Sequence, residues 1–366
     1  MTAGVAAPAK SGFGRFFLPG PTDVHPEVLA AMERPMLGHR SGAMEALLAG
    51  MAPKLQSLAR TVRPVLVGTC SATGFMEMAV RNGVRRRALA IVNGSFSERF
   101  AALVSVCGKE CVRLDVPLGS AVEPDMVRDA LRRTPVDAVT IVHSETSTGV
   151  LQDIEGISRA VHEFDDVLFL VDAVTSMAGS PVESDAWGLD FALTGSQKAL
   201  ALPPGLAVGV ASERMLQRAK TLEARGLYFD LVTFEQATVR HQPTNTPAIS
   251  LMFALDTQLS RIEREGGIEA RWRRHDAMRQ RVERWATERG LEFVPLLGRR
   301  SWTVSCVKLP PNKISKDVVA ALKKEGFVIG SGYGKLKDTT IRIGHMGDHT
   351  VEGLEALLPL IDRALA

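Results

Sequence analysis

Short apolar runs alternate with amphipathic stretches along the first two thirds of the chain. The apolar runs are continuous rather than alternating with polar residues, which is typical of strands buried on both faces of a sheet. The predicted strands span 64–68, 87–92, 111–116, 138–143, 167–173, 191–196 and 205–212. The stretches between them predict helices at 75–84, 97–108, 123–134 and 154–164. Alternation of strands and helices indicates an α/β domain with a mostly parallel central sheet, whose sites form at the carboxyl ends of the strands.

A second region follows with a different order of elements. Residues 251–267 and 268–290 predict two long helices with solvated charged faces. The order then becomes strand, helix, strand, strand, helix, which predicts a small α+β domain. These elements span 302–309, 315–326, 327–332, 339–347 and 349–366. We therefore expect a flexible segment at 1–16, a large domain at 17–250 and a small C-terminal domain at 251–366.

Composition narrows the possible functions. The chain has 366 residues, 45% hydrophobic and 23% charged, with a net charge of +3, which is ordinary for a globular protein. Like charges never extend beyond the three arginines at 85–87, and only 5% of residues are aromatic, so nucleic-acid binding is not expected. No apolar stretch of about 18 residues predicts a membrane span, and the N-terminus lacks a signal-peptide pattern. The four cysteines show no CxxC spacing, which predicts neither disulfides nor a metal site and favours the reducing cytoplasm.

Three motifs at strand ends carry candidate chemistry. The first, "VGTCSATGFMEMA" at 67–79, runs from a strand through small hydroxyl-bearing residues into a helix. Backbone N–H groups at the helix start, with the hydroxyls of Ser71 and Thr73, would form a cradle for an anion. The same residues could instead form an ordinary capping turn, because serine and threonine are favoured at helix starts.

The other two motifs bring an acid and an amine. Asp172 ends the apolar run of "FLVDAVTS", where it could pair with a protonated ring nitrogen or simply cap a turn. Lys198 lies in "LTGSQKALALPPG", which contains no other charge, so it is either a snorkelling surface lysine or a desolvated amine able to attack a carbonyl. An anion cradle, an acid and an amine in this order on an α/β sheet are what pyridoxal phosphate requires.

With these motifs in place, the chain resembles a class V aminotransferase of the fold type I pyridoxal-phosphate enzymes. It is most similar to the alanine–glyoxylate and serine–pyruvate aminotransferase family. The resemblance runs from about residue 17 to the C-terminus, and "HSETSTGVLQ" and "GSQKAL" are its most specific blocks. The other matching blocks are "FLPGPTDVHPEVLAAM", "MLGHRS", "ATGFMEMAV", "NGSFSERF", "LVDAVTSMAG", "NTPAISL" and "IRIGHMG".

The resemblance implies a role for each matching cofactor residue. Lys198 resembles the Schiff-base lysine, and Asp172 resembles the partner of the pyridine nitrogen. Phe96 matches the aromatic ring that stacks on the cofactor, Val174 the residue on the opposite ring face, and Thr146 the hydroxyl near the phenolic oxygen. The positions that match phosphate contacts are Ser71, Ala72, Thr73 and Gln197, together with Asn245 and Thr246, which reach the phosphate of the neighbouring subunit. The family is a homodimer with its site at the subunit interface.

Two further positions match substrate contacts. Arg342 resembles the arginine that binds the α-carboxylate of the substrate, and a planar guanidinium suits such bidentate pairing. Gly20 falls where the loop backbone approaches the substrate. The sequence departs from many relatives at Ala72, where they have glycine, and at Phe75, where they have a small residue. Both departures leave the hydroxyl positions intact.

The resemblance implies transfer of an amino group between an amino acid and a 2-oxo acid in two ping-pong half-reactions. Alanine or serine with glyoxylate or pyruvate is the expected pairing. The alternative is phosphoserine with 2-oxoglutarate, for which His39, Arg40 and Arg300 could supply positive charge. A lyase or desulfurase would need a mobile catalytic cysteine. Cys306, the last cysteine of the chain, lies in a predicted strand and is better interpreted as a buried strand residue. A subunit that has lost its chemistry is disfavoured by the intact set of Lys198, Asp172 and Arg342.

Overall fold

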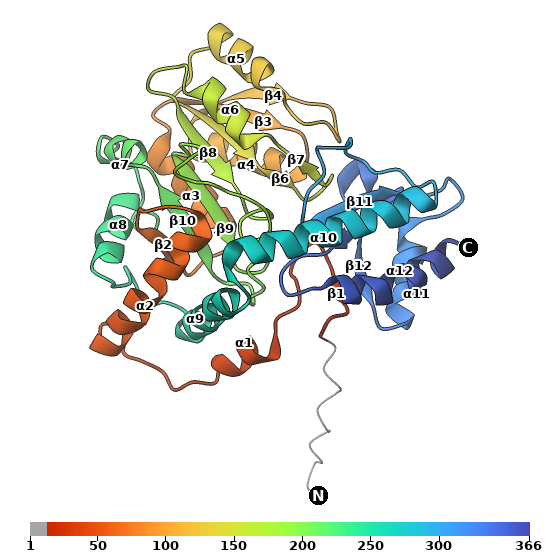
Figure 1. The fold of residues 1–366 in the computed structure, drawn as a ribbon. Coiled ribbons are helices and arrows are strands. Elements are labelled where there is room, and N and C mark those ends of the chain that lie inside the picture. Colours follow the sequence, from red (N-terminus) through yellow and green to blue (C-terminus); the bar gives the residue numbers. More distant parts are fainter. Residues whose placement is uncertain (1–12) are drawn as a thin grey trace, which may run out of the picture.

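The structure of the protein, a computed structural model, describes residues 13–366 (Figure 1). Most of the predicted flexible segment lies outside the described residues. The predicted boundary at residue 17 falls inside the first strand, β1 (Phe16–Phe17), which pairs with a strand of the C-terminal region. The start of the described chain is therefore joined to the small C-terminal sheet. The predicted division near residue 250 falls at the start of helix α9 (Ile249–Arg264).

A seven-stranded sheet forms the centre of the larger part of the molecule, in the order β2-β10-β9-β8-β5-β3-β4. The strands are β2 (Val65–Gly68), β3 (Arg87–Val92), β4 (Glu110–Asp115), β5 (Ala138–Val142), β8 (Leu168–Asp172), β9 (Phe191–Gly195) and β10 (Ala207–Ala211). Strand β10 is antiparallel to both of its neighbours, and the other pairings are parallel. The predicted fold class and the positions of the strands are confirmed. The expected burial on both faces does not hold for β4, which lies at the edge of the sheet and is partly exposed.

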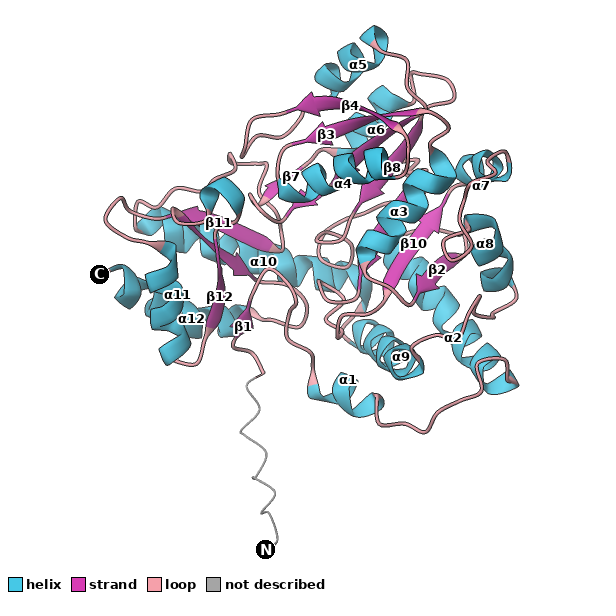
Figure 2. Ribbon diagram, turned by 180° about the vertical axis from the view of Figure 1, so that it is seen from behind, coloured by secondary structure: helices cyan, strands magenta, loops and turns pink. Residues whose placement is uncertain are grey.

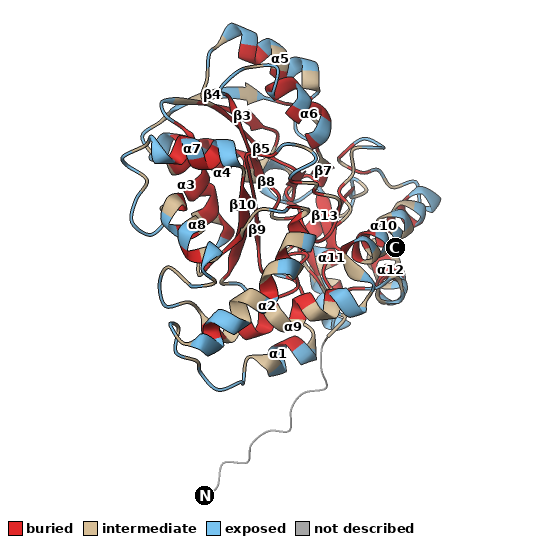
Figure 3. Ribbon diagram, turned by 60° about the vertical axis from the view of Figure 1, so that its left-hand side comes forward, coloured by how far each residue is buried: buried red, intermediate tan, exposed pale blue. Residues whose placement is uncertain are grey.

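Helices cover both faces of this sheet (Figures 2 and 3). Successive side chains of a strand point to opposite faces, so each buried strand feeds two cores. Along β8, Leu168 and Leu170 pack into one core, whereas Phe169 and Val171 pack into the other. The helices are α1 (Pro26–Ala31), α2 (Gly42–Ala59), α3 (Ala72–Gly83), α4 (Ser95–Val106), α5 (Pro124–Arg133), α6 (Ile154–Val161), α7 (Glu213–Lys220), α8 (Leu231–Val239), α9 and α10 (Gly267–Glu288).

A second sheet has four strands in the order β1-β12-β13-β11. Its other elements follow the predicted order, and together they enclose a separate apolar core that includes Trp285 of α10. They are β11 (Val304–Lys308), α11 (Ser315–Lys324), β12 (Val328–Ser331), the short helix η1 (Gly334–Leu336), β13 (Thr340–Gly344) and α12 (Val351–Leu365). Helix α10 runs between the two sheets (Figure 1). The two-stranded ribbon of β6 (Ser144–Glu145) and β7 (Val150–Leu151) completes the fold. No helix within residues 13–366 is long and apolar enough to span a membrane.

Candidate active site

A cavity of about 250 Å³ lies at the carboxyl ends of the central strands. Chain segments that follow β2, β3, β5, β8 and β9 supply its walls, as expected for a parallel sheet. Nine of the predicted cofactor residues line it: Ser71, Ala72, Thr73, Phe96, Thr146, Asp172, Val174, Gln197 and Lys198. The fold thus brings together residues that are up to 127 positions apart between Ser71 and Lys198.

Asp172 is the last residue of β8, and its side chain is only 3% exposed. The backbone N–H of Val174 donates a hydrogen bond to its carboxylate at 2.8 Å. Burial raises the pKa of Asp172 to about 7, and the Val174 hydrogen bond and the nearby Lys198 only partly oppose this shift. A protonated ring nitrogen beside this carboxylate would supply the missing counter-charge.

Lys198 follows β9 in a turn and is 7% exposed. Its ammonium donates a hydrogen bond to the backbone carbonyl of Pro19. Burial lowers the pKa of Lys198 to about 8, and the positive charge of Arg342 lowers it further, whereas Asp172 acts in the opposite direction. Gly20, which directly adjoins the Lys198 side chain, has a φ of +122°, a backbone conformation that glycine favours. The amine is therefore desolvated rather than snorkelling.

The turn before α3 is built as an anion cradle. Ser71 is the N-cap residue of α3, yet its side chain makes no capping hydrogen bond, so its hydroxyl is free for a ligand. Free N–H groups and the helix dipole at this end favour a phosphate. Phe75 does not disturb the cradle, because its fully buried ring packs against Phe191 and Phe234 in the core. The hydroxyl-bearing turn thus keeps the predicted form despite the departure at position 75.

An aromatic side chain, an aliphatic side chain and a hydroxyl all belong to the wall of the cavity. Phe96, on α4, lies with its ring centroid 5.7 Å from the Lys198 ammonium nitrogen. Val174 lines the cavity as well, two residues beyond Asp172. The hydroxyl of Thr146 exchanges a hydrogen bond of 2.6 Å with that of Thr175. A flat ring that occupied this cavity would have an aromatic side chain, an aliphatic one and a hydroxyl around it.

Arg342 comes from β13 of the smaller sheet and approaches the cavity from there. It is 9% exposed, and its guanidinium donates to the backbone carbonyls of Ser331 at 2.8 Å and Thr146 at 3.1 Å. Tyr333 lies below the guanidinium, with its ring centroid 5.4 Å away. No carboxylate within residues 13–366 forms an ion pair with Arg342, so the guanidinium can bind one from a ligand.

Six predicted residues do not line the cavity of their own chain. Gly20 lies directly behind Lys198, and Arg342 bonds to the carbonyl of Thr146, which does line it. Asn245 and Thr246 are exposed in the loop before α9, and His39 and Arg40 lie in the loop between α1 and α2. Arg300, considered for a substrate phosphate, instead pairs with Glu283 at 3.5 Å and stacks over Phe293 in the smaller part of the molecule. The cluster of positive charge that phosphoserine would need is therefore not assembled within one chain.

Some residues that shape the site carry no pattern in the sequence. Arg99, Thr175 and Met76 line the cavity, and Tyr333 stacks on Phe96 with ring centroids 5.9 Å apart. The spacing of Arg99, one helical turn after Phe96, could have indicated it. Nothing in the sequence indicated Tyr333, since its place depends on how the two sheets meet.

The donor set fits pyridoxal phosphate. It has a buried amine of lowered pKa, a buried acid whose pKa is raised to about 7, and a serine hydroxyl at a helix start that makes no capping hydrogen bond. Cys306 is fully buried in β11, and burial raises its pKa to about 11, so it is an inert thiol. Within residues 13–366, no group of three or more side chains could hold a metal ion. Fold and site together define a fold type I pyridoxal-phosphate enzyme.

Comparison with known proteins names the family. The family model for class-V aminotransferases matches residues 99–357, and the chain belongs to this family. An uncharacterized aminotransferase of Methanocaldococcus jannaschii is 36% identical over 95% of this chain and 91% of its own length. An aspartate aminotransferase of Thermus thermophilus superposes with a TM-score of 0.89 at 33% identity, covering 96% of this chain and 99% of the other. An alanine–glyoxylate aminotransferase of Nostoc superposes with a TM-score of 0.92 at 28% identity, covering 100% and 98%.

The chain is therefore an aminotransferase that depends on pyridoxal phosphate. Lys198 would hold the cofactor covalently, Asp172 would face its ring nitrogen, and the turn before α3 would receive its phosphate. These individual roles follow from geometry and resemblance and stay predictions.

Proposed function

We propose that the enzyme moves an amino group from a small amino acid, alanine or serine, to glyoxylate or pyruvate. The observation that carries this proposal is the buried guanidinium of Arg342, which lacks a carboxylate partner in the described chain and bonds to the carbonyl of Thr146, a residue that lines a cavity of only about 250 Å³. One arginine suits one α-carboxylate, and limited space suits a short side chain. The alanine–glyoxylate aminotransferase among the structural relatives supports the same pairing.

Each site residue then has one task. Pyridoxal phosphate supplies an electron sink when it is bound. Asp172 keeps the ring nitrogen protonated, and Arg342 orients the α-carboxylate so that the Cα–H bond faces Lys198. The amine of Lys198 would take that proton from the substrate Cα and deliver it to C4′ of the cofactor, a task that its lowered pKa of about 8 suits near neutral pH. Water is excluded by the buried walls around the cavity.

Donor and acceptor would use the same place in turn. Both are small 2-substituted carboxylates, and the guanidinium of Arg342 can bind only one of them at a time. The amino group must therefore remain on the enzyme while the first product leaves, which predicts ping-pong kinetics.

We further propose a homodimer in the cytoplasm. Asn245 and Thr246 are exposed and unused in their own chain, and Leu227 is 97% exposed on the segment that precedes them. Burying this side chain against a partner would remove apolar surface from water, which is favourable. The four cysteines are free, which suits a reducing compartment.

The test is a panel of donors and acceptors. Purified holoenzyme would be assayed with alanine, serine, aspartate and phosphoserine against glyoxylate, pyruvate and 2-oxoglutarate. We expect the highest kcat/KM for alanine or serine with glyoxylate or pyruvate. A higher value for aspartate or phosphoserine would overturn the proposed substrate class.

Lys198→Ala tests the catalytic assignment itself. The variant should lose transamination and the absorbance band of the bound cofactor, because no other amine lines the cavity in the described chain. Lys220→Ala, which removes an exposed lysine at the end of α7, should change neither. If Lys198→Ala kept both activity and the band, the assignment would be wrong.

A further inference from the structure

A second buried carboxylate lies beside the cavity and has no role in the chemistry proposed above. Glu145 is the second residue of β6 and is 0% exposed. Glu145 does not line the cavity, whereas Asp172 and Lys198, whose charges act on it, both do. A buried carboxylate without a cationic partner costs free energy unless hydrogen bonds satisfy it. The question is what it holds.

The donors to Glu145 come from the start of helix α4 and from the turn that follows β6. Its carboxylate accepts hydrogen bonds from the backbone N–H groups of Phe96 at 3.1 Å and Ser97 at 2.9 Å. The hydroxyl of Ser97 donates at 3.1 Å, and Ser147 donates from its N–H at 3.0 Å and from its hydroxyl at 2.6 Å. The carboxylate thus caps the first turn of α4, where free N–H groups and the helix dipole favour negative charge.

The approach is close and specific. A Cβ atom at Gly94, the N-cap residue of α4, would overlap the Glu145 side chain. Glycine at this position therefore lets the carboxylate reach the helix end. Glycine has no side chain that could cap the helix. Glu145, which lies on the distant strand β6, supplies the capping group instead.

The residues fixed by this contact are the ones that face the cofactor pocket. Phe96 donates to Glu145 through its backbone and lines the cavity with its side chain. Thr146 is the next residue after Glu145, and its carbonyl accepts a hydrogen bond from Arg342. The Glu145 carboxylate is consequently linked to both parts of the pocket. It bonds to the backbone of Phe96, and it adjoins Thr146, whose carbonyl bonds to Arg342.

We propose that Glu145 is a positioning residue that holds Phe96 against the cofactor ring by capping the first turn of helix α4. The proposal rests on the stacking role proposed for Phe96. Glu145 touches neither substrate nor cofactor, so its effect on cofactor binding passes through the Phe96 backbone.

A double-mutant cycle tests this coupling. The affinity of the cofactor-free protein for pyridoxal phosphate would be measured by absorbance titration for the wild type, Glu145→Gln, Phe96→Ala and the double variant. Loss of the aromatic contact should weaken affinity about 3- to 10-fold in Phe96→Ala. Glu145→Gln should cause a similar loss, because an amide turns donors toward the N–H groups of α4. The affinity of the double variant should be at most about twofold lower than that of Phe96→Ala, since both changes remove the same contact between the Phe96 ring and the cofactor.

Two matched variants separate position from charge. Glu98→Gln removes a carboxylate from the same helix, where it pairs with Arg113 at the surface, and should leave affinity unchanged. Glu145→Asp keeps the charge but withdraws it from the helix end by one methylene, and should behave like Glu145→Gln. Thermal melting of each variant verifies that it is folded, and Ser147→Ala, which removes a single bond to the carboxylate, should give a smaller loss.

The outcomes are distinct. If Glu145→Gln keeps wild-type affinity, or if its loss multiplies with that of Phe96→Ala, the positioning role is wrong. If Glu145→Asp binds like the wild type, the carboxylate acts through charge, and the proposal is again wrong. If Phe96→Ala itself has no effect, the stacking role fails and the proposal fails with it. Failure of the wild-type protein to bind the cofactor would instead overturn the function proposed for the site.

Discussion

Burial gives Asp172 and Lys198 their chemical character at the scale of single residues. Both are more than nine-tenths buried, and burial moves their pKa values toward each other, up to about 7 for the acid and down to about 8 for the amine. Desolvation disfavours the charged form of either group, so the same physical cause produces opposite shifts. The acid and the amine thus have close pKa values without direct contact.

The raised pKa of Asp172 predicts a cost in stability for the cofactor-free protein. Well below its ordinary pKa of 3.8, the carboxyl is protonated in both the folded and the unfolded state, so its ionisation does not change the free energy of unfolding. Between its ordinary pKa of 3.8 and about 7, the unfolded state loses the proton first, so the stability of the folded protein falls as pH rises. Asp172→Asn should therefore stabilise the cofactor-free protein at about pH 8 by up to about 4 kcal/mol.

Urea unfolding of the cofactor-free wild type and Asp172→Asn across this pH range measures the effect. The difference should shrink as pH falls toward the ordinary aspartate pKa. A difference independent of pH would show that ionisation of Asp172 is not its cause.

Arg342 predicts a loss in substrate affinity rather than in cofactor affinity. Arg342→Gln removes a charge-assisted contact worth about 1.5–3 kcal/mol, so KM for the amino acid should rise about 10- to 100-fold. Steady-state kinetics and a cofactor titration on the same preparation check both parts. Lys337→Gln, which changes an exposed lysine shortly before β13, is the control and should leave KM unchanged. Unchanged KM in Arg342→Gln would remove the arginine from the carboxylate site.

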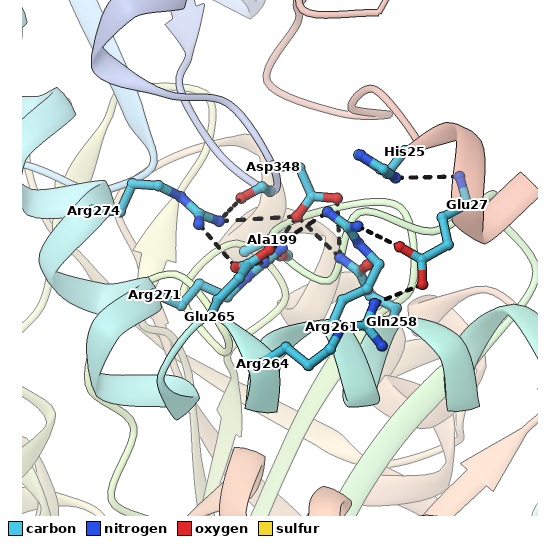
Figure 4. A network of polar contacts seen from close by, with 11 residues as sticks. His25, Glu27, Ala199, Gln258, Arg261, Arg264, Glu265, Arg271, Arg274 and Asp348 are labelled. Carbon is cyan, nitrogen blue, oxygen red and sulfur yellow. Dashed lines mark hydrogen bonds and ion pairs between the residues drawn. The ribbon is translucent and has the colours of Figure 1, made fainter.

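At the scale of elements, a buried polar network fastens the lysine-bearing turn to helix α10 and to the turn after β13 (Figure 4). Arg271 is fully buried and donates to the carbonyl of Ala199 at 2.7 Å and to Asp348 at 2.9 Å. Arg274 donates to Gly347 at 2.9 Å beside it. The guanidinium of Arg271 thus links Ala199, the residue after Lys198, to Asp348 in the smaller part of the molecule.

Breaking this network should be costly. Arg271→Met leaves the Asp348 side chain, which is only 4% exposed, with a weakened set of partners, so the free energy of unfolding should fall by about 3–5 kcal/mol. Arg264→Met removes an exposed arginine that pairs with Glu27 in the neighbouring network, and should cost about 1 kcal/mol or less. Chemical denaturation of both variants compares them. Similar losses for the two would mean that the buried pair is worth no more than a surface one.

At the scale of the whole molecule, the exposed Asn245 and Thr246 predict that a second copy completes the site. Lys198→Ala and the double variant Asn245→Ala, Thr246→Ala should each be impaired alone. In a mixed dimer, the first chain lends its intact loop to the lysine of the second, so one of two sites is restored. Activity should recover to about one quarter of the wild type after unfolding, mixing and refolding, if subunits pair at random. Dimers without any recovery would show that the loop serves its own chain.

The elements differ in how far the sequence could predict them. The strands of the central sheet were predicted within one or two residues at most ends, because a strand covered on both faces needs an unbroken apolar run. Helices α1, α2, α7 and α8 were not predicted. Helix α2 contains Gly50 and Pro53, which weaken the helical pattern, and its stability comes from packing against α9 and the sheet.

The sequence by itself determined the α/β alternation, the order of cradle, acid and amine, and the family to which they point. These are local properties, since strand burial, helix starts and turn residues are written in neighbouring positions. Only the tertiary structure decided that Ser71 is free of capping, that Phe75 turns into the core, and that Arg300 lies elsewhere. It alone joined Glu145 to Phe96 and Arg342 to Thr146 at the wall of the cavity, because contacts between distant segments depend on how the sheets and helices pack.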